Sequence, residues 1–342
     1  MTCKLTFLPV GNADSIIIQD DNSLILVDLG NPNILEEWLQ EHKISSIDRI
    51  YITHAHGDHF PSLTRLVDFL NTQFKHGTIE KLHLPYNILE IARKKVLSDR
   101  KNPKNKRLEL ALNRITEWRK ERAIKLSPIV QDGEEYSKGS LKIKALHPSQ
   151  DYIENHLALT SSKLNEISIV LQVMYGKFSA LLLADIEGTG LAEFLSSLKI
   201  NSEHTEFPVN VVKIPHHGAY PANGDDLKEL LALINAEIAI LSVGSKNTYG
   251  HVKPQLFKAL IELRDAQHLK QFICTEVTRT CKLSSSDRPT MGKLSVAEKC
   301  AGEITIIADT SGSWELKVET PDHPSKVSSF AHAACIGRAE LD

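Results

Sequence analysis

Short apolar runs rich in leucine and β-branched residues alternate with polar turns at the start of the chain. These runs occupy residues 5–10, 15–19 and 24–28, and they predict three β-strands. Asn31-Pro32-Asn33 is typical of a helix start, and we expect a helix that continues to about His42. Residues 49–52 predict a further buried strand, which leads directly into a cluster of histidines. A helical stripe of leucine and valine follows from Leu63.

Segments with strand and helix periods alternate again after residue 140. Strands are predicted at residues 141–146, 167–175, 178–184, 209–214, 237–243, 271–274, 303–308 and 314–318, and helices at 190–198, 225–234 and 254–265. Such alternation is typical of a layered α/β fold. We expect one domain over residues 1–320 and a loosely ordered tail over 321–342, because the tail is terminal.

The segment at residues 86–126 differs in charge from the rest of the chain. Between Arg93 and Lys125 there are thirteen Lys or Arg and four Asp or Glu, whereas the whole chain has a formal charge of -3. Its apolar residues at helical spacing are Leu108, Leu112, Ile115 and Trp118, which predict an amphipathic helix lying on the body of the protein. We interpret the segment as a basic helical insertion; the alternative is an ordinary solvated helix face.

Composition indicates a globular protein of a reducing compartment. Hydrophobic residues make up 42% of the 342 residues and charged residues 24%, which is enough to bury a full core. The five cysteines are scattered without a CxxC pair, which argues against a disulfide framework or a cysteine zinc ribbon. The apolar runs fall short of the roughly 20 residues that span a bilayer, and the first residues lack a signal-peptide pattern. We therefore expect a cytoplasmic protein that acts away from the membrane.

The histidine cluster offers four metal ligands within six residues. His54, His56, Asp58 and His59 carry imidazole and carboxylate groups, which bind zinc, manganese and iron. Alternation along an extended chain points His54 and His56 the same way, and Gly57 permits a turn that directs Asp58 and His59 to a second metal position. Because the cluster follows a buried strand, we expect it at the rim of a sheet, where open α/β folds place their sites.

The His-x-His-x-Asp-His pattern resembles the signature of metallo-β-lactamase-like hydrolases, and the resemblance extends over roughly Lys4 to Val318. In particular, the chain is similar to the branch that contains the hydrolase domain of the ComEC DNA-uptake channel. The matching blocks are FLPVGNADS (residues 7–15), ILVDLG (25–30), NEISIVL (165–171), LLLADI (181–186), VKIPHHG (212–218) and NTYGH (247–251). The resemblance implies a four-layer αββα sandwich and a free-standing hydrolase without a membrane channel.

The resemblance also implies a centre with two divalent metals, zinc in the first place and manganese or iron as alternatives. Its ligands would be His54 and His56 at the first metal, Asp58, His59 and His216 at the second, and Asp185 as a bridge between them. His217 is the alternative to His216, either as a ligand or as a residue that supports one. Asp28 would orient a histidine ligand.

The chain departs from the family pattern at two places. Asn165-Glu166 stands where most members supply a third histidine to the first metal, so this metal would be weakly held or bound through Asn165 and water. Asn12-Ala13 replaces the Gln-Gly that the branch usually has before Asp14, which leaves Asp14 near the metals without an assigned role.

These residues predict hydrolysis by a metal-activated water. Asp58 or Asp185 would accept a proton, and His251 would assist the leaving group. We favour a phosphodiester substrate, DNA or RNA, that follows the basic segment through Lys101, Lys104, Lys106 and Arg107. The alternatives are hydrolysis of a lactam, lactone, thioester or phosphocholine ester, an inactive binding or regulatory module, and an effector, as in a defence system, that acts with a protein partner.

Overall fold

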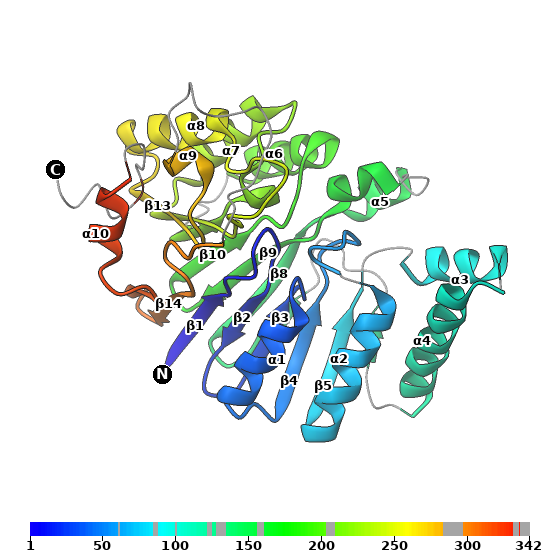
Figure 1. Ribbon diagram of the computed structural model, residues 1–342. Coiled ribbons are helices and arrows are strands. Elements are labelled where there is room, and N and C mark those ends of the chain that lie inside the picture. Colours follow the sequence, from blue (N-terminus) through cyan, green and yellow to red (C-terminus); the bar gives the residue numbers. More distant parts are fainter. Residues whose placement is uncertain are drawn as a thin grey trace.

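Two β-sheets packed face to face form the centre of the computed structural model, and helices cover their outer faces (Figure 1). The structure describes residues 1–342 except 61, 85–87, 100, 122–124, 128–134, 156–160, 203–208, 283–296, 331–334 and 336–342. The mixed α/β class and the four-layer αββα arrangement predicted from the sequence are thereby confirmed.

The first sheet has eight strands in the order β15-β14-β1-β2-β3-β4-β5-β6. Their bounds are Thr2–Phe7 (β1), Ile16–Gln19 (β2), Leu24–Val27 (β3), Ser46–Tyr51 (β4), Thr78–His83 (β5), Lys125–Ser127 (β6), Ile304–Asp309 (β14) and Trp314–Val318 (β15). Pairing is antiparallel from β15 to β3 and parallel from β3 to β6. Parallel neighbours need crossover connections, which α1 (Pro32–Glu41) and α2 (Leu63–His76) supply.

The second sheet has seven strands in the order β13-β12-β11-β10-β9-β8-β7. Their bounds are Glu135–Lys138 (β7), Leu141–His147 (β8), Val170–Tyr175 (β9), Phe178–Leu182 (β10), Val211–Lys213 (β11), Ile238–Leu241 (β12) and Gln271–Cys274 (β13). Its parallel half runs from β10 to β13. The connecting helices are α6 (Gly188–Ser202), α7 (Gly224–Ile234) and α8 (Pro254–Asp265), with the short α9 (Arg279–Lys282) after β13.

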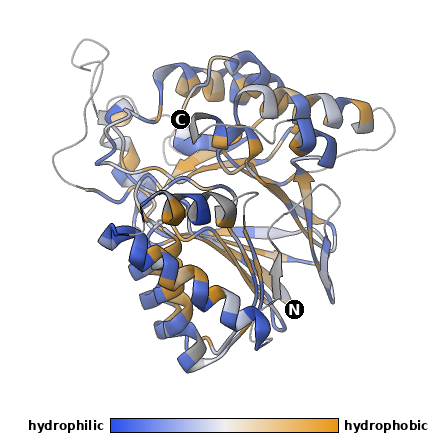
Figure 2. Ribbon diagram, turned by 90° about the vertical axis from the view of Figure 1, so that its right-hand side faces the viewer, coloured by the Kyte–Doolittle hydropathy of each residue, from blue (hydrophilic) through white to orange (hydrophobic). Residues whose placement is uncertain are grey.

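Apolar side chains fill the layers between these elements, and Figure 2 shows hydrophobic residues along the sheets and hydrophilic residues on the outer sides of the helices. Side chains such as Phe7, Leu171 and Phe178 pack between the two sheets. A second cluster joins the first sheet to α1 and α2, and a third joins the second sheet to α6, α7 and α8. Both sheets are therefore covered on both faces, and their loops are left to meet at the sheet ends.

The basic segment forms two helices, α3 (Ile88–Ser98) and α4 (Pro103–Lys120). As predicted, α4 is amphipathic: Ala111, Ile115 and Trp118 are buried in the cluster beneath the first sheet, and Leu108 and Leu112 pack against it. Within the segment, residues 86–87, 100 and 122–124 lie outside the described residues.

Shorter helices complete the fold, namely α5 (Gln150–Asn155), two 3-10 helices at Ser161–Ile167 and Pro215–Gly218, and α10 (His323–Ser328). The last of these lies in the tail for which we expected loose order. Val327 of α10 is fully buried in the helical side of the second sheet, which explains why these residues are helical. Residues 331–334 and 336–342 of the tail lie outside the described residues.

Two expectations from composition can be compared with the structure. Among the helices of the described residues, none combines the length and apolarity that a membrane span requires. All five cysteines are buried free thiols.

Candidate metal centre

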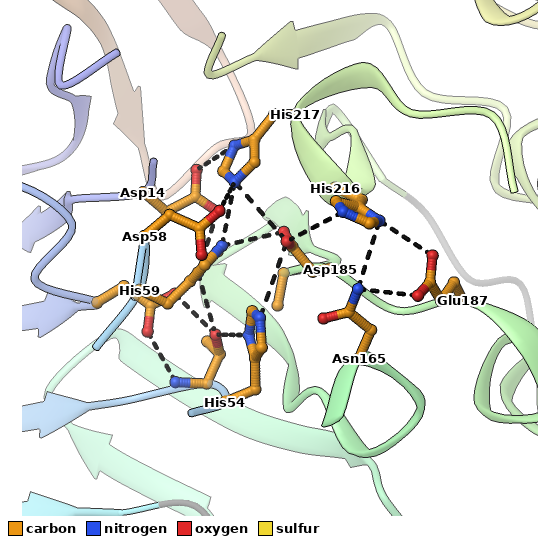
Figure 3. A network of polar contacts seen from close by, with 12 residues as sticks. Asp14, His54, Asp58, His59, Asn165, Asp185, Glu187, His216 and His217 are labelled. Atoms are coloured by element: carbon orange, nitrogen blue, oxygen red, sulfur yellow. Dashed lines mark hydrogen bonds and ion pairs between the residues drawn. The ribbon is translucent and has the colours of Figure 1, made fainter. Parts of the chain in front are cut away.

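Acidic and imidazole side chains from both sheets converge where the parallel strands end (Figure 3). Asp28 follows β3, and His54 to His59 follow β4 in the first sheet. Asp185 follows β10, and His216-His217 follow β11 in the second. The carboxyl ends of parallel strands lie at one edge of each sheet, so these four loops meet across the sandwich. Gly30 allows the close approach, because a Cβ there would lie 2.4 Å from the carbonyl oxygen of Asp58.

One group of four buried residues offers metal ligands that all face one another. Asp14, His59, Asp185 and His217 each contribute one atom, and these atoms lie within 4.8 Å of each other. His59 Nε2 is 3.1 Å from Asp185 Oδ1 and 3.2 Å from His217 Nε2. A second group overlaps it and contains His54, Asp58 and His59. Most of the residues predicted from the sequence are thus brought together.

Asp28 fixes the orientation of His59. The Oδ2 of Asp28 lies 2.6 Å from His59 Nδ1. The Thr53 amide donates to Oδ1 of Asp28 and the Thr53 hydroxyl donates to Oδ2, each at 2.7 Å. A carboxylate behind one ring nitrogen leaves the other nitrogen free to face a metal. Burial raises the pKa of Asp28, and the attraction of His59 offsets this only in part.

Asp185 stands between the histidines. Its Oδ1 faces His59, while its Oδ2 lies 3.8 Å from His54 Nε2, 3.7 Å from His217 Nε2 and 4.0 Å from His216 Nε2. Burial alone would raise the pKa of Asp185, but the charges of His59 and His217 hold it well below its usual value. An ionised carboxylate with different histidines at its two oxygens has the arrangement of a bridging ligand.

Of the two adjacent histidines, the structure places the alternative candidate, His217, among the other predicted ligands. His217, not His216, joins Asp58 and His59, with its Nε2 3.5 Å from Asp58 Oδ2. Its Nδ1 donates to the Ser242 carbonyl at 2.9 Å, which leaves the Nε2 lone pair directed into the centre. Both histidines have left-handed backbone angles, φ +49° and +50°, so consecutive side chains take directions that an extended chain would not give.

His216 takes part in a separate contact beside Asn165. Its Nδ1 lies 3.0 Å from Glu187 Oε2, and Asn165 Nδ2 donates to Glu187 Oε1 at 2.8 Å. The Oδ1 of Asn165 and the Nε2 of His54 are both buried and have no hydrogen-bond partner. Buried polar atoms are nearly always paired, so these two atoms indicate that the centre receives a further group.

Lys213 is a member of the centre that the sequence analysis missed. Its ammonium is fully buried, forms an ion pair with Asp14, donates to the Ala184 carbonyl at 2.9 Å and lies 3.8 Å from Asp185 Oδ1. Burial lowers the pKa of Lys213, but the charges of Asp14 and Asp185 raise it more. The signal was a lone lysine within the apolar run 209–214 beside His216-His217.

The other predicted site residues lie farther out. His56 is half-buried, with its ring 4.9 Å from that of His54. The ring of His251 lies 5.6 Å from that of His216, and burial followed by repulsion from His216 and His217 lowers the pKa of His251 to about 3. The four cations predicted to contact nucleic acid are exposed around the start of α4, namely Lys101, Lys104, Lys106 and Arg107.

The donor atoms suit a divalent transition metal. Neutral imidazole nitrogens and carboxylate oxygens are the ligands that zinc, manganese and iron take. Burial lowers the pKa of His59, yet the charges of Asp185 and Asp28 raise it well above its usual value, so the surplus of carboxylates favours positive charge at this point. The orphaned His54 and Asn165 atoms add two further donors.

Residues 8–136 match the family model described as the Metallo-beta-lactamase superfamily. The match covers less than half of the chain, and within it the chain is similar to the superfamily that the sequence motifs indicate. The matched region includes Asp14, Asp28 and the whole His54–His59 cluster.

Individual proteins resemble parts of the chain. Over 84 residues it is 34% identical to ribonuclease Z of Pyrococcus abyssi (strain GE5 / Orsay), a match that covers 24% of this chain and 26% of that protein. The metallo-beta-lactamase fold protein YhfI from Bacillus subtilis is 10% identical, with a TM-score of 0.45, over 80% of this chain and 96% of that one. Human tRNase Z, short form, is 13% identical, with a TM-score of 0.37, over 79% and 91%. At such TM-scores the two structural likenesses carry no argument about function.

Proposed function

We propose that this chain is a metal-dependent phosphodiesterase that acts on nucleic acid. The observation that carries the proposal is the convergence of Asp14, His59, Asp185 and His217, with mutually facing ligand atoms, beside His54 and Asp58. Zinc fits these ligands first, with manganese or iron as alternatives.

Two metal positions follow from the directions of the donor atoms. Asp58, His59 and His217 would hold one metal, and His54 with His56 would begin the other. Asp185 would contact both, since its two oxygens face different histidines. When bound, such metals polarise the scissile group and lower the pKa of a water toward about 7.

The side chains of the chain itself would manage the protons. Hydrolysis of a phosphodiester adds a hydroxyl to phosphorus, breaks one P–O bond and delivers a proton to the departing oxygen. Burial raises the pKa of Asp58, but His217 and His59 hold it well below the usual range, so the carboxylate is ionised and can accept a hydrogen bond that orients the attacking water. His251 is neutral near pH 7 and can donate a hydrogen bond to the departing oxygen.

A groove that reaches the start of α2 supports a polymeric phosphodiester as the substrate. It lies between α2 and α4, has a volume of about 850 Å³ and is lined by three arginines and two acidic residues, namely Arg65, Arg107, Arg114, Asp68 and Glu117. Ser62 at its rim is three residues from His59 and caps α2. Cationic side chains attract a phosphate backbone, and the partial relative named ribonuclease Z acts, by its name, on RNA.

Elemental analysis paired with activity assays tests the proposal. The purified chain should bind divalent metal and cleave bis(p-nitrophenyl) phosphate as well as DNA or RNA. His54→Ala and Asp58→Ala should lose bound metal and hydrolysis while the fold survives, because both residues lie on a loop. The matched control is His268→Ala, an exposed histidine distant in sequence from the cluster. Wild-type activity and metal content in either loop variant would refute the site assignment.

The same experiment separates the other functions. Cleavage of esters or lactones without cleavage of any phosphodiester would identify a small-ester hydrolase. Fewer than one metal per chain, without activity, would identify an inactive binding or regulatory module. A cytoplasmic location is part of the proposal, because all five cysteines are free thiols.

A further inference from the structure

We infer that Glu187 is a positioning residue that completes the metal position beside His54, by directing the amide oxygen of Asn165 and the Nε2 of His216 toward it. The inference rests on the proposed metal centre. Glu187 follows Asp185 by two residues, at the junction between β10 and α6, and no motif in the sequence singles it out.

The carboxylate of Glu187 holds two neighbours at once. Its Oε1 accepts from Asn165 Nδ2 at 2.8 Å, and its Oε2 lies 3.0 Å from His216 Nδ1 (Figure 3). Asn165 Nδ2 also lies 3.4 Å from His216 Nδ1, but both nitrogens donate to Glu187, so this third distance is a close approach and not a hydrogen bond. Neither neighbour can turn without breaking its hydrogen bond with Glu187.

The two hydrogen bonds to Glu187 determine which atoms of Asn165 and His216 face the metal centre. With Nδ2 of Asn165 bound to Glu187, the amide presents Oδ1, which is buried and has no hydrogen-bond partner. With Nδ1 of His216 bound, its Nε2 is left 4.0 Å from Asp185 Oδ2. His54 Nε2 lies 3.8 Å from the same carboxylate oxygen. An amide oxygen and a histidine nitrogen thus lie near Asp185 and His54, in a chain whose sequence has Asn165 in the place of a third histidine.

Hydrogen bonds and close backbone packing fix the chain on the C-terminal side of Glu187. Asn223 clamps the next residue, since its Oδ1 accepts from the Gly188 amide at 3.2 Å and its Nδ2 donates to the Gly188 carbonyl at 2.9 Å. Gly190 lets the Asn165 segment approach α6, because a Cβ there would lie 2.0 Å from the Glu166 carbonyl oxygen. Residues 165–166 and 187–190 are therefore held side by side.

The alternative is that Glu187 makes an ordinary half-exposed ion pair with His216, which would contribute little. Glu187→Gln separates the two roles, because the amide keeps the size of the side chain and loses the paired acceptors. Carboxylates behind metal ligands typically contribute roughly 10- to 100-fold in metal affinity. We therefore expect one of two metal equivalents to bind roughly 10- to 100-fold more weakly in Glu187→Gln, while the other stays within about threefold of wild type.

The measurement is a titration of metal-free protein with Zn²⁺ by calorimetry and with Co²⁺ by absorption, independent of turnover. Glu193→Gln is the matched control, since its side chain is 30% exposed against 29% for Glu187 and contacts Ser149 Oγ at 2.9 Å and His147 Nε2 at 3.6 Å. Thermal unfolding of both variants without metal should agree, which excludes a general loss of stability. Asn165→Ala should weaken the same equivalent, and it keeps the inference testable if Glu187→Gln fails to fold.

The results distinguish this inference from the proposed function. Two metals bound as in wild type by Glu187→Gln, equal weakening of both, or a wild-type protein with a single metal equivalent would each overturn the role of Glu187. Selective weakening of one equivalent in a protein that cleaves no phosphodiester would sustain the role of Glu187 and overturn the proposed function alone.

Discussion

Neutralising the exposed cations at the start of α4 should change how nucleic-acid binding depends on salt. The perturbation is the replacement of Lys101, Lys104, Lys106 and Arg107 by glutamine. All four are exposed, and Arg107 lines the groove between α2 and α4. Their removal should leave the fold intact, because the buried contacts of α4 are made by Ala111, Ile115 and Trp118.

The magnitude follows from counterion release. Each duplex phosphate contact contributes about 0.9 to the slope of log affinity against log salt, so four lost contacts flatten it by about 3.6; a single strand, at about 0.7 each, gives about 2.8. Between 50 and 200 mM salt, the wild type should therefore lose about 100-fold more duplex affinity than the variant.

The assay is fluorescence anisotropy of labelled DNA and RNA in chelator, so that binding is measured without cleavage. Turnover of bis(p-nitrophenyl) phosphate with metal should hardly change, since this substrate needs only the metal centre. A control variant replaces exposed lysines on other elements, namely Lys199, Lys258, Lys270 and Lys317. An unchanged slope would refute the reasoning and make the segment a solvated helix face or a protein-docking surface, while equal losses on both substrates would reveal a folding defect.

Three further substitutions probe the centre and its surroundings. Asp185→Asn should weaken metal binding at both positions and lower turnover at least tenfold, about 1.4 kcal/mol; unchanged stoichiometry with a smaller loss would show that Asp185 is not the bridge. Asp28→Asn should lower metal affinity roughly 10- to 100-fold through His59, and a titration that matches wild type would contradict this role. His147→Asn should make stability less dependent on pH. Burial lowers the pKa of His147 to about 4. As pH falls from about 6.5 to 4, this histidine therefore takes up a proton only in the unfolded state, and the free energy of unfolding falls by up to about 3 kcal/mol. His147→Asn keeps a donor toward the Ser168 carbonyl. In urea denaturation, its free energy of unfolding should no longer fall over this pH range by the amount due to His147, and the same pH profile as wild type would contradict this role of His147.

The hydrophobic pattern predicts the elements whose buried faces are uninterrupted. The bounds of α8 and β13 agree with the predicted ranges, and β1 to β4 agree within a few residues. In contrast, β5 was missed because Thr78, Glu80 and Lys81 break up its apolar residues. The helix α10 was missed because its stability comes from burial of Val327 against residues distant in sequence.

The site was predictable where its ligands are neighbours in the sequence or follow an apolar strand. The His54–His59 spacing and the place of Asp185 after β10 singled out residues that the structure brings close together. The choice between His216 and His217 depends on left-handed backbone angles, which residue identities there do not reveal. Glu187 acts only through contacts with Asn165 and His216, residues that the fold brings together, so its role required the structure.

The origin of the ligands in loops of both sheets has a thermodynamic consequence. A metal held by His59 from one sheet and by Asp185 and His217 from the other is a cross-link between the two halves of the sandwich. Because the unfolded chain lacks this site, stability should rise with free metal concentration by mass action, by about 2.7 kcal/mol at 100 times the dissociation constant. Metal supply would then set the free energy of unfolding as well as the activity, and a chelator would lower the stability of the sandwich while its apolar core keeps it folded.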